Sequence, residues 1–190
     1  VQHTFLRTLQ QQLALALKSA ISLSRALTDD LTGVYSRNMM EEQITLAMDQ
    51  AKRYGHPCSL LFLDIDNFKQ INDQHGHLVG DEVLKRIGRL LQDLARNSDV
   101  VGRLGGEEFG VLLYGEDAQQ ARDCAEKLRL ALLDLRLPHA ASPTAEVLSL
   151  CIGVACRLPG SGVSISRLMS QADRALYQAK GLGRNKVVLL

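Results

Sequence analysis

Apolar residues recur along the chain in two patterns, which predict helices and strands in alternation. Helical spacing, with apolar residues three or four positions apart, runs through 1–29, 37–54, 81–96, 116–135 and 165–180. Continuous or alternating apolar blocks, typical of strands, occupy 58–65, 99–104, 108–114, 146–156 and 187–190. From residue 58 onward the predicted order is β-α-β-β-α-β-α-β. This order predicts an α/β (α+β) fold, in which helices flank a central mixed β-sheet that contains a hairpin.

The first predicted helix carries an apolar seam. Its apolar residues alternate between spacings of three and four, as in a coiled coil, and they are Leu6, Leu9, Leu13, Ala16, Ala20, Leu23 and Leu27. Two partners fit this seam equally well: a second subunit, or the domain that follows. The turn-forming run Asp29-Asp30-Leu31-Thr32-Gly33 ends the helix. We therefore expect a coiled-coil-like signalling helix over 1–28 and one domain over 29–190.

Net charge and cysteine placement narrow the classes of partner and site that are expected for this chain. Lys and Arg total 22 and Asp and Glu total 21, which gives a net charge of +1. Because proteins that bind duplex nucleic acid usually carry a strong basic excess, DNA and RNA are not expected partners. The four cysteines lie in apolar segments without a Cys-x-x-Cys pair. This placement predicts buried, reduced thiols.

The chain shows neither an apolar run long enough to span a bilayer nor a signal peptide. A cytoplasmic setting is therefore expected for the domain. Since the first residue is not Met, we expect a fragment of a longer protein, with an upstream sensory domain or a membrane anchor.

Two carboxylate pairs follow strong strand signals. Asp64 lies near the end of the apolar block 58–65, which Asp66 follows directly, and residues two apart lie on the same side of an extended chain. The run Gly105-Gly106-Glu107-Glu108 lies at the tip of the predicted hairpin, where glycine lets the backbone turn and approach a ligand. Either pair alone is typical of a solvated turn. Together, beside two buried strands, they predict an oxygen-rich site for a hard divalent cation such as Mg²⁺.

Three basic residues are candidates for binding phosphate. Lys69 follows the first acidic pair closely, and Lys180 and Arg184 lie at the end of the last predicted helix. A basic helix C-terminus also complements the helix dipole, so these two residues alone fit either role.

The chain from about residue 28 to residue 190 resembles the GGDEF family of diguanylate cyclases. The matching stretches are DDLTGVYSR at 29–37, LLFLDIDNFKQINDQHGHLVGDEVL at 60–84, RLGGEEFGVLL at 103–113 and ADRALYQAKGLGRNKV at 172–187. Ser36 departs from the family, which usually has Asn there, and this puts a local turn bond in doubt. The resemblance implies a fold like that of the palm of nucleotide cyclases and polymerases, and the condensation of two GTP into cyclic di-GMP and two pyrophosphates.

The resemblance also implies roles for individual residues. Mg²⁺ or Mn²⁺ on the GTP phosphates would be held by Asp64, the backbone of Ile65, Glu107 and Glu108. Of these, Glu107 would also assist deprotonation of the attacking 3′-hydroxyl, and Asp66 would support the site.

The substrate contacts implied by the resemblance are more numerous. Asn72 and Asp81 would bind the guanine edge, and an Asp that accepts from two guanine donors would reject adenine. The remaining GTP contacts would come from Phe68, Lys69, Leu84, Gly105, Gly106, Lys180 and Arg184. Since each domain of the family holds one GTP, two copies would have to face each other as a homodimer.

A second site is implied by the run Arg96-Asn97-Ser98-Asp99, which five residues separate from Gly105. It matches the Arg-x-x-Asp motif through which cyclic di-GMP inhibits members of the family. An arginine fork suits both the guanine Hoogsteen edge and phosphate. A helix-ending Arg and a turn Asp are the alternative explanation.

Other functions stay open at this stage. One is a catalytically silent domain that binds GTP or cyclic di-GMP. A second is a structural role in dimerising an upstream domain, and a third is a mononucleotide cyclase. Intact DID and GGEEF motifs favour an active diguanylate cyclase over all three.

Overall fold

The computed structural model describes residues 12–14, 27–139 and 147–190, and it places one five-stranded sheet at the centre of the described residues. The strands are β1 (Cys58–Ile65), β2 (Val100–Arg103), β3 (Glu108–Tyr114), β4 (Leu150–Arg157) and β5 (Val187–Leu189). Their order in the sheet is β2-β3-β1-β4-β5. Only the β4–β5 pair is parallel, and the other neighbours are antiparallel. The sheet is therefore mixed, as the sequence predicts.

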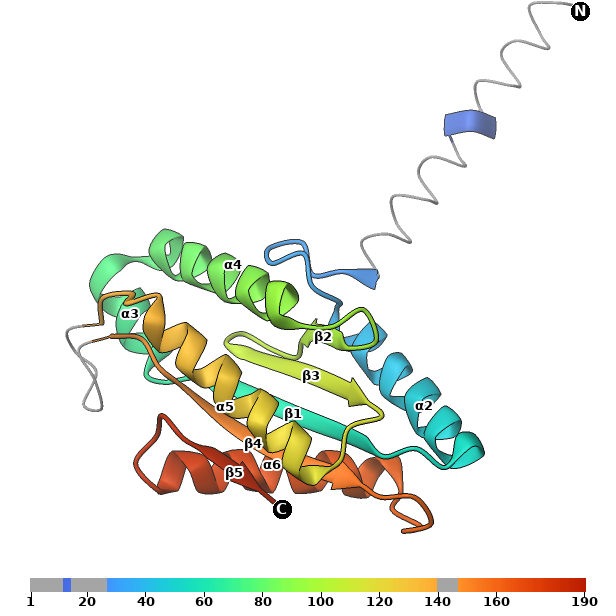
Figure 1. Cartoon of the computed structure of the whole chain (residues 1–190). Helices are drawn as coiled ribbons and strands as arrows, with labels where there is room; N and C mark the ends of the chain where they lie inside the picture. Colours follow the sequence, from blue (N-terminus) through green and yellow to red (C-terminus); the bar gives the residue numbers. More distant parts are fainter. Residues whose placement is uncertain (1–11, 15–26, 140–146) are drawn as a thin grey trace, which may run out of the picture.

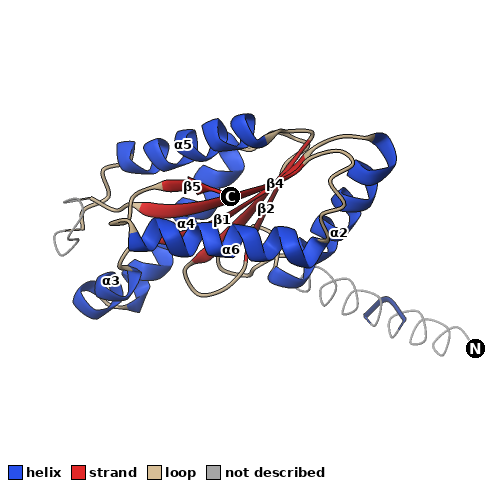
Figure 2. Cartoon of the chain, turned by 90° about the horizontal axis from the view of Figure 1, so that it is seen from below, coloured by secondary structure: helices blue, strands red, loops and turns tan. Residues whose placement is uncertain are grey.

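Helices cover both faces of this sheet (Figures 1 and 2). They are α2 (Arg37–Tyr54), α3 (Phe68–His75), α4 (His77–Leu94), α5 (Ala118–Asp134) and α6 (Ile165–Gly181). Leu61 and Leu63 of β1 join a core with α4 and α5, whereas Leu60 joins a core with α2 and α6. Alternate residues of β1 thus face opposite layers, which explains why CSLLFLDI is apolar at nearly every position.

Helix α6 packs unusually close to the sheet, and a glycine makes this possible. A Cβ at Gly153 of β4 would lie 2.2 Å from both the Ala172 carbonyl oxygen and the Leu176 backbone nitrogen. Because both atoms belong to the backbone of α6, no side-chain rotation can relieve the contact. The position of α6 on the sheet therefore depends on this glycine.

The segment after β1 differs from the sequence prediction. Residues 66–80 are predicted as an irregular stretch before a helix at 81, but α3 lies within it and α4 begins at His77. Gly76, with φ 83°, separates the two helices. The apolar pattern of α3 is short because only Phe68 and Ile71 are buried in it.

The other bounds agree with the prediction to within a few residues, with one exception. The predicted strand 146–156 begins as β4 at Leu150, and Val147 forms only an isolated bridge to Pro138. Most of the predicted N-terminal helix lies outside the described residues, and of its first 26 positions residues 12–14 are described as helical. Within the described ranges, no helix has the length and apolar composition that crossing a bilayer requires.

The cysteine prediction is confirmed in part. All four thiols are free, and Cys58 and Cys151 are buried, but Cys124 and Cys156 are half-buried. Burial raises the pKa of Cys58 to about 11 and that of Cys151 to about 12. Both thiols are therefore protonated and unreactive at neutral pH.

Candidate active site

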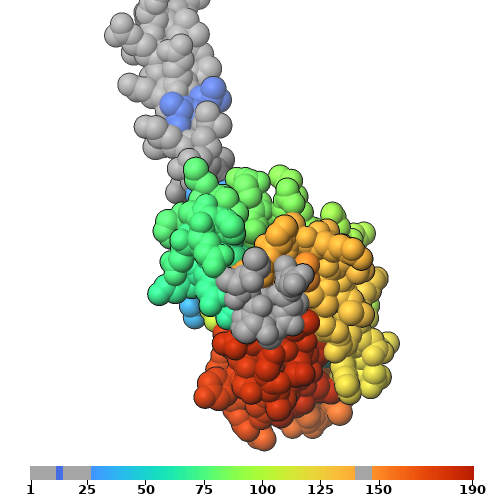
Figure 3. Space-filling view, turned by 90° about the vertical axis from the view of Figure 1, so that its left-hand side faces the viewer, coloured from blue at the N-terminus to red at the C-terminus, as the bar shows by residue number. Residues whose placement is uncertain are grey.

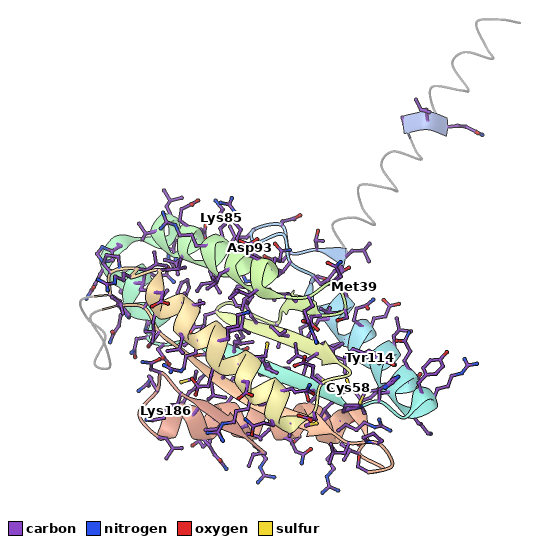
Figure 4. All side chains as sticks on the ribbon, viewed as in Figure 1. Met39, Cys58, Lys85, Asp93, Tyr114 and Lys186 are labelled. Atoms are coloured by element: carbon purple, nitrogen blue, oxygen red, sulfur yellow. The ribbon has the colours of Figure 1, made fainter. Side chains whose placement is uncertain are left out.

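The predicted catalytic segments meet at one end of the sheet. β1 ends there, β3 begins there after the GGEEF turn, and α3 and the C-terminal end of α6 lie beside them (Figure 1, left). Figure 3 looks onto this end, with the surface of α3 and α4 above that of the α6–β5 segment. Lys186, labelled in Figure 4, marks the same end.

Asp64 is the most enclosed acid of the predicted metal-binding set. It lies opposite Glu108 in the antiparallel ladder, and its side chain is 9% exposed. Lys180 Nζ lies 2.7 Å from Asp64 Oδ2. Burial raises the pKa of Asp64 above its ordinary value, and the charges of Glu108 and Asp66 add to this rise, which Lys180 offsets only in part.

The two glutamates of the GGEEF turn lie close enough to Asp64 to interact with it electrostatically. Burial raises the pKa of Glu107, and the charges of Asp64 and Glu108 raise it further. The Glu107 carbonyl oxygen accepts a hydrogen bond of 3.4 Å from the backbone N–H of Ile65. The turn is thereby joined to the end of β1.

These carboxylates do not form a finished metal-binding group. Among the residues described, no three His, Cys, Asp or Glu side chains are gathered closely enough to hold a metal ion. The expected gathering of the acids is therefore not seen in their side chains, although β1 and β3 bring Asp64 and Glu108 opposite each other. Like charges repel, and Lys180 provides the positive charge nearest Asp64.

Lys180 and Glu108 also line a cavity of about 260 Å³ on the outer side of α6. Burial alone lowers the pKa of Lys180, but the hydrogen bond and the charge of Asp64 outweigh burial and raise it. Lys180 is therefore cationic at neutral pH and faces open space beside the acids. Lys69, in contrast, is exposed on α3.

Asp66, which the resemblance implies is a supporting residue, is held by three hydrogen bonds at the end of β1. Its carboxylate is 1% exposed and accepts hydrogen bonds from Ser149 Oγ at 2.7 Å, Cys151 Sγ at 3.0 Å and the Asn185 backbone N–H at 3.0 Å. Arg184 and Asn185 have left-handed φ values of 61° and 46°. The bond to Asn185 thus holds the turn after α6, which carries Arg184, against the end of β1.

The residues predicted to bind guanine lie on α3 and α4. Phe68 and Leu84 are buried in the core, and Asn72 and Asp81 are half-buried. A Cβ at Gly80 would lie 1.9 Å from Asn72 Oδ1 and 3.2 Å from the Phe68 ring. The absence of a side chain at position 80 therefore leaves the room that the Asn72 amide occupies.

Arg103 belongs to the site although the sequence-based prediction omits it. Its guanidinium donates to the Gly105 and Gly106 carbonyl oxygens at 3.1 and 2.7 Å, and to Asp29 Oδ1 at 3.1 Å. Asp29 also accepts from the Thr32 backbone N–H and hydroxyl. Arg103 thus connects the GGEEF turn to the DDLTG turn. The sequence signal that could have identified it is its position shortly before the GGEEF motif.

Ser36, the departure from the family pattern, still caps a helix. It is the N-cap of α2, and its hydroxyl oxygen accepts from the Met39 backbone N–H at 3.4 Å. Ser36 therefore still makes a local side-chain bond at the start of α2.

The Arg-x-x-Asp motif forms a closed unit on the surface. Arg96 donates to Asp99 Oδ1 at 2.7 Å, and it also pairs with Glu116. The Arg96 side chain is 48% exposed, whereas that of Asp99 is 3% exposed. Cavities of about 390 and 360 Å³ both reach these two residues. The Arg96 side chain is thus half-exposed, while its guanidinium nitrogens are bonded to Asp99 and Glu116.

Comparison with known proteins identifies relatives of this arrangement. The chain is 40% identical over 158 residues to the probable diguanylate cyclase DgcC of Escherichia coli, a match that covers 83% of this chain and 42% of DgcC. The chain therefore spans less than half the length of this curated relative.

Solved structures agree with the sequence matches. The coiled coil and GGDEF domain of DgcB from Caulobacter crescentus, in complex with c-di-GMP, superposes with a TM-score of 0.85 at 28% identity, covering 99% of this chain and 98% of that one. An active GGEEF domain of a diguanylate cyclase from Vibrio cholerae gives a TM-score of 0.72 at 36% identity, covering 81% and 96%. The family model "Diguanylate cyclase, GGDEF domain" matches residues 26–186. The chain accordingly belongs to the GGDEF domain family of diguanylate cyclases.

Proposed function

We propose that this domain condenses two molecules of GTP into cyclic di-GMP and two pyrophosphates. The observation that carries the proposal is the meeting of Asp64, Glu108 and Lys180 at one end of the sheet, beside the GGEEF turn. Acids of this kind bind hard cations, and a lysine binds phosphate oxygens. The names of the relatives support the same reaction.

The glycines of the GGEEF turn leave space for a nucleotide phosphate close to the backbone. Gly106 does not have a left-handed φ, and a Cβ placed there would have no neighbour within 4 Å. Nothing in the described chain therefore requires glycine at this position. A ligand that lies directly over the backbone would require it, since a side chain would fill that space.

A divalent cation, Mg²⁺ or Mn²⁺, fits the donors present. Asp64, Glu107 and Glu108 supply carboxylate oxygens, and the backbone of Ile65 lies between them. When bound, such a cation would offset charge on the phosphates. Burial is the main reason that the pKa values of Asp64 and Glu107 are raised, and repulsion between the carboxylates adds to the rise, a contribution that a bound cation would remove.

The remaining residues orient the substrate. Asp81 and Asn72 offer guanine an acceptor and an amide, and Lys180 and Arg184 bind phosphate oxygens. In the reaction, the 3′-hydroxyl of one GTP attacks the α-phosphorus of the other as pyrophosphate departs in line. Glu107 assists by accepting the hydroxyl proton, and its raised pKa suits a proton acceptor better than an ordinary glutamate would. Two domains must face each other, because each holds one GTP.

The test is analysis of the products, by chromatography and mass, after incubation of the chain with GTP and Mg²⁺. Cyclic di-GMP from the wild type, and a loss of about 10²-fold or more in Glu107→Gln, is the expected result. A folded, dimeric wild type that binds GTP and makes no product would instead establish a silent binding module. A product of one nucleotide would establish a mononucleotide cyclase.

We also propose that cyclic di-GMP inhibits the enzyme at Arg96 and Asp99. The cyclic di-GMP complex of DgcB supports product binding in a relative. In this chain, two cavities reach Arg96, whose side chain is half-exposed, and a guanine base that displaces Glu116 would bind the guanidinium. Asp99 fixes that guanidinium in place.

The Arg96→Ala variant is expected to keep its basal rate and to need at least about tenfold more product for half-inhibition, since a bidentate arginine contact is worth a tenfold change or more. Inhibition is measured by adding cyclic di-GMP to the GTP reaction. Arg89→Ala, which removes an exposed arginine of α4, is the matched control and should behave as wild type. Unchanged product sensitivity in Arg96→Ala would refute this site.

A further inference from the structure

Helix α4 carries a buried glycine in its first turn, at position 80, directly before Asp81. Inside a helix, glycine is less favourable than alanine, because it loses more backbone freedom on folding. The backbone of Gly80 does not require glycine either, since its φ does not lie in the left-handed region. The reason for glycine here therefore lies in the groups that surround it.

The main neighbour is the side chain of Asn72 on α3, a helix that packs against α4 (Figure 1). A Cβ built on Gly80 would overlap Asn72 Oδ1, and it would lie 3.0 Å from Asn72 Cγ and 3.2 Å from Phe68 Cζ. Two of these three atoms belong to the Asn72 amide. The Phe68 ring is 5% exposed and lies in the core, so it has little freedom to move aside.

The turn between the two helices fixes the backbone on both sides of this contact. The Gly76 N–H donates to the Asn72 carbonyl oxygen at 2.9 Å, and the Gly80 N–H donates to the Gly76 carbonyl oxygen at 3.3 Å. These bonds hold the main chain of Asn72 near that of Gly80. The half-buried Asn72 side chain is thus the part that a methyl group at position 80 would displace.

We propose that Gly80 is a positioning residue for guanine: by leaving room beside α4, it holds the Asn72 amide where the amide can bind the base of GTP. The inference rests on the proposed function, in which Asn72 and Asp81 bind the guanine edge. A displaced amide keeps its chemistry but loses the orientation that a hydrogen bond requires. Gly80 therefore sets the affinity for the base, whereas the affinity for the phosphates depends on other residues.

Binding to the full chain tests this proposal without turnover. One probe is the α,β-methylene analogue of GTP, which cannot release pyrophosphate, and the other is inorganic tripolyphosphate, which has no base. Each is titrated by calorimetry in the presence of Mg²⁺. Gly80→Ala should bind the GTP analogue about tenfold more weakly than wild type, as expected for one lost hydrogen bond. It should bind tripolyphosphate as wild type does.

Gly88→Ala is the matched control, because Gly88 is a second buried glycine of α4. A Cβ there would lie 3.0 Å from Thr32 Cβ and 3.2 Å from the Thr32 carbonyl oxygen, so the added methyl group meets Thr32 rather than Asn72. This variant should lower stability in urea and leave the ratio of the two affinities unchanged.

A double-mutant cycle with Asn72→Ala identifies the residue through which Gly80 acts. In the Asn72→Ala background, Gly80→Ala should cause no further loss of affinity for the GTP analogue. The loss of stability in urea should also be smaller in that background, because the overlap with the amide is gone and the Phe68 contact remains.

The proposal is overturned if Gly80→Ala and Gly88→Ala show the same ratio of affinities. It is also overturned if the losses in Gly80→Ala and Asn72→Ala add, because Gly80 would then act through Asp81 or through the fold. Where Gly80→Ala alone does not fold, a double variant that folds supports the proposal, and one that does not fold overturns it. A wild type that binds the GTP analogue and makes no cyclic di-GMP contradicts the proposed function alone, and the affinities still decide the role of Gly80.

Discussion

At the scale of single residues, the candidate site holds acids whose charged forms the fold disfavours. Asp64 and Glu107 both have raised pKa values, chiefly because they are buried and also because neighbouring carboxylates repel them. The folded protein therefore holds these two protons more tightly than the unfolded chain does. Ionising them weakens the folded state, so the free energy of unfolding falls as pH rises from their ordinary values of 3.8 and 4.5 through the raised ones.

Glu107→Gln should remove the part of the pH dependence of the free energy of unfolding that Glu107 contributes. We expect the variant to be more stable than wild type once the pH exceeds the raised pKa of Glu107, because the amide carries no charge to repel Asp64. It should also lose activity, as is common where catalytic groups are strained. Chemical denaturation without added metal, at pH values from about 4 to about 8, measures the difference.

The exposed Glu42 of α2 provides the comparison for this experiment. Glu42→Gln should leave the pH profile of wild type nearly unchanged. A Glu107→Gln profile that runs parallel to wild type across the whole range would show that repulsion at the site does not affect stability.

The sequence identified these acids but not their immediate partners. Asp64, Glu107 and Glu108 stand next to strong strand signals, so their meeting followed from the strand pattern. The ion pair between Asp64 and Lys180 could not be predicted from that pattern, because the two residues lie far apart in the sequence. Arg103 was missed for the same reason, since its partner Asp29 lies 74 residues away.

At the scale of elements, helix α6 connects sheet packing with the site. Its backbone lies so close to β4 that Gly153 has no room for a Cβ, and its last turn carries Lys180. A displacement of this helix away from the sheet therefore moves Lys180 relative to Asp64.

Gly153→Ala should consequently reduce both stability and activity. The added methyl group meets backbone atoms of α6, and overpacking of this kind costs about 1–3 kcal/mol. Urea denaturation measures the loss in stability, and the GTP reaction measures the loss in activity. Gly181→Ala, at the end of the same helix with open space around it, should be nearly neutral in stability. Equal stability of the two variants would contradict the close packing described here.

The elements that the sequence predicted well are those with long apolar patterns. The eight residues of β1 and the stripe of α4 were recognisable because burial demands apolar side chains there. Helix α3 was not, because FKQINDQH buries only two residues and is held in place by α4. The start of β4 was set by pairing with β1, which a local pattern does not reveal.

At the scale of the whole molecule, the proposed reaction requires two domains, while the described residues form a single sheet with an apolar core on each face. The apolar seam in residues 6–27 offers a means of bringing two copies together.

Removal of residues 1–26 should therefore lower specific activity by about tenfold or more in dilute protein, and the loss should diminish as concentration rises. The cut preserves Leu27 and Thr28, because the Leu27 carbonyl accepts from Ser36 and Thr28 forms a bridge with Tyr35. Activity and sedimentation across a dilution series provide the measurement. Identical dilution behaviour of the full and shortened chains would exclude a dimerising role for the segment.

The position of β1 in the sheet has a consequence for how the protein is made. β1 is the first strand of the sheet along the chain, yet it lies between β3 and β4. While a ribosome extends the chain, CSLLFLDI emerges with both edges open, and its second edge is covered only after residue 157 has been synthesised. An open apolar strand edge promotes aggregation. Products of premature termination before β4 should therefore aggregate more readily than a chain that includes β4.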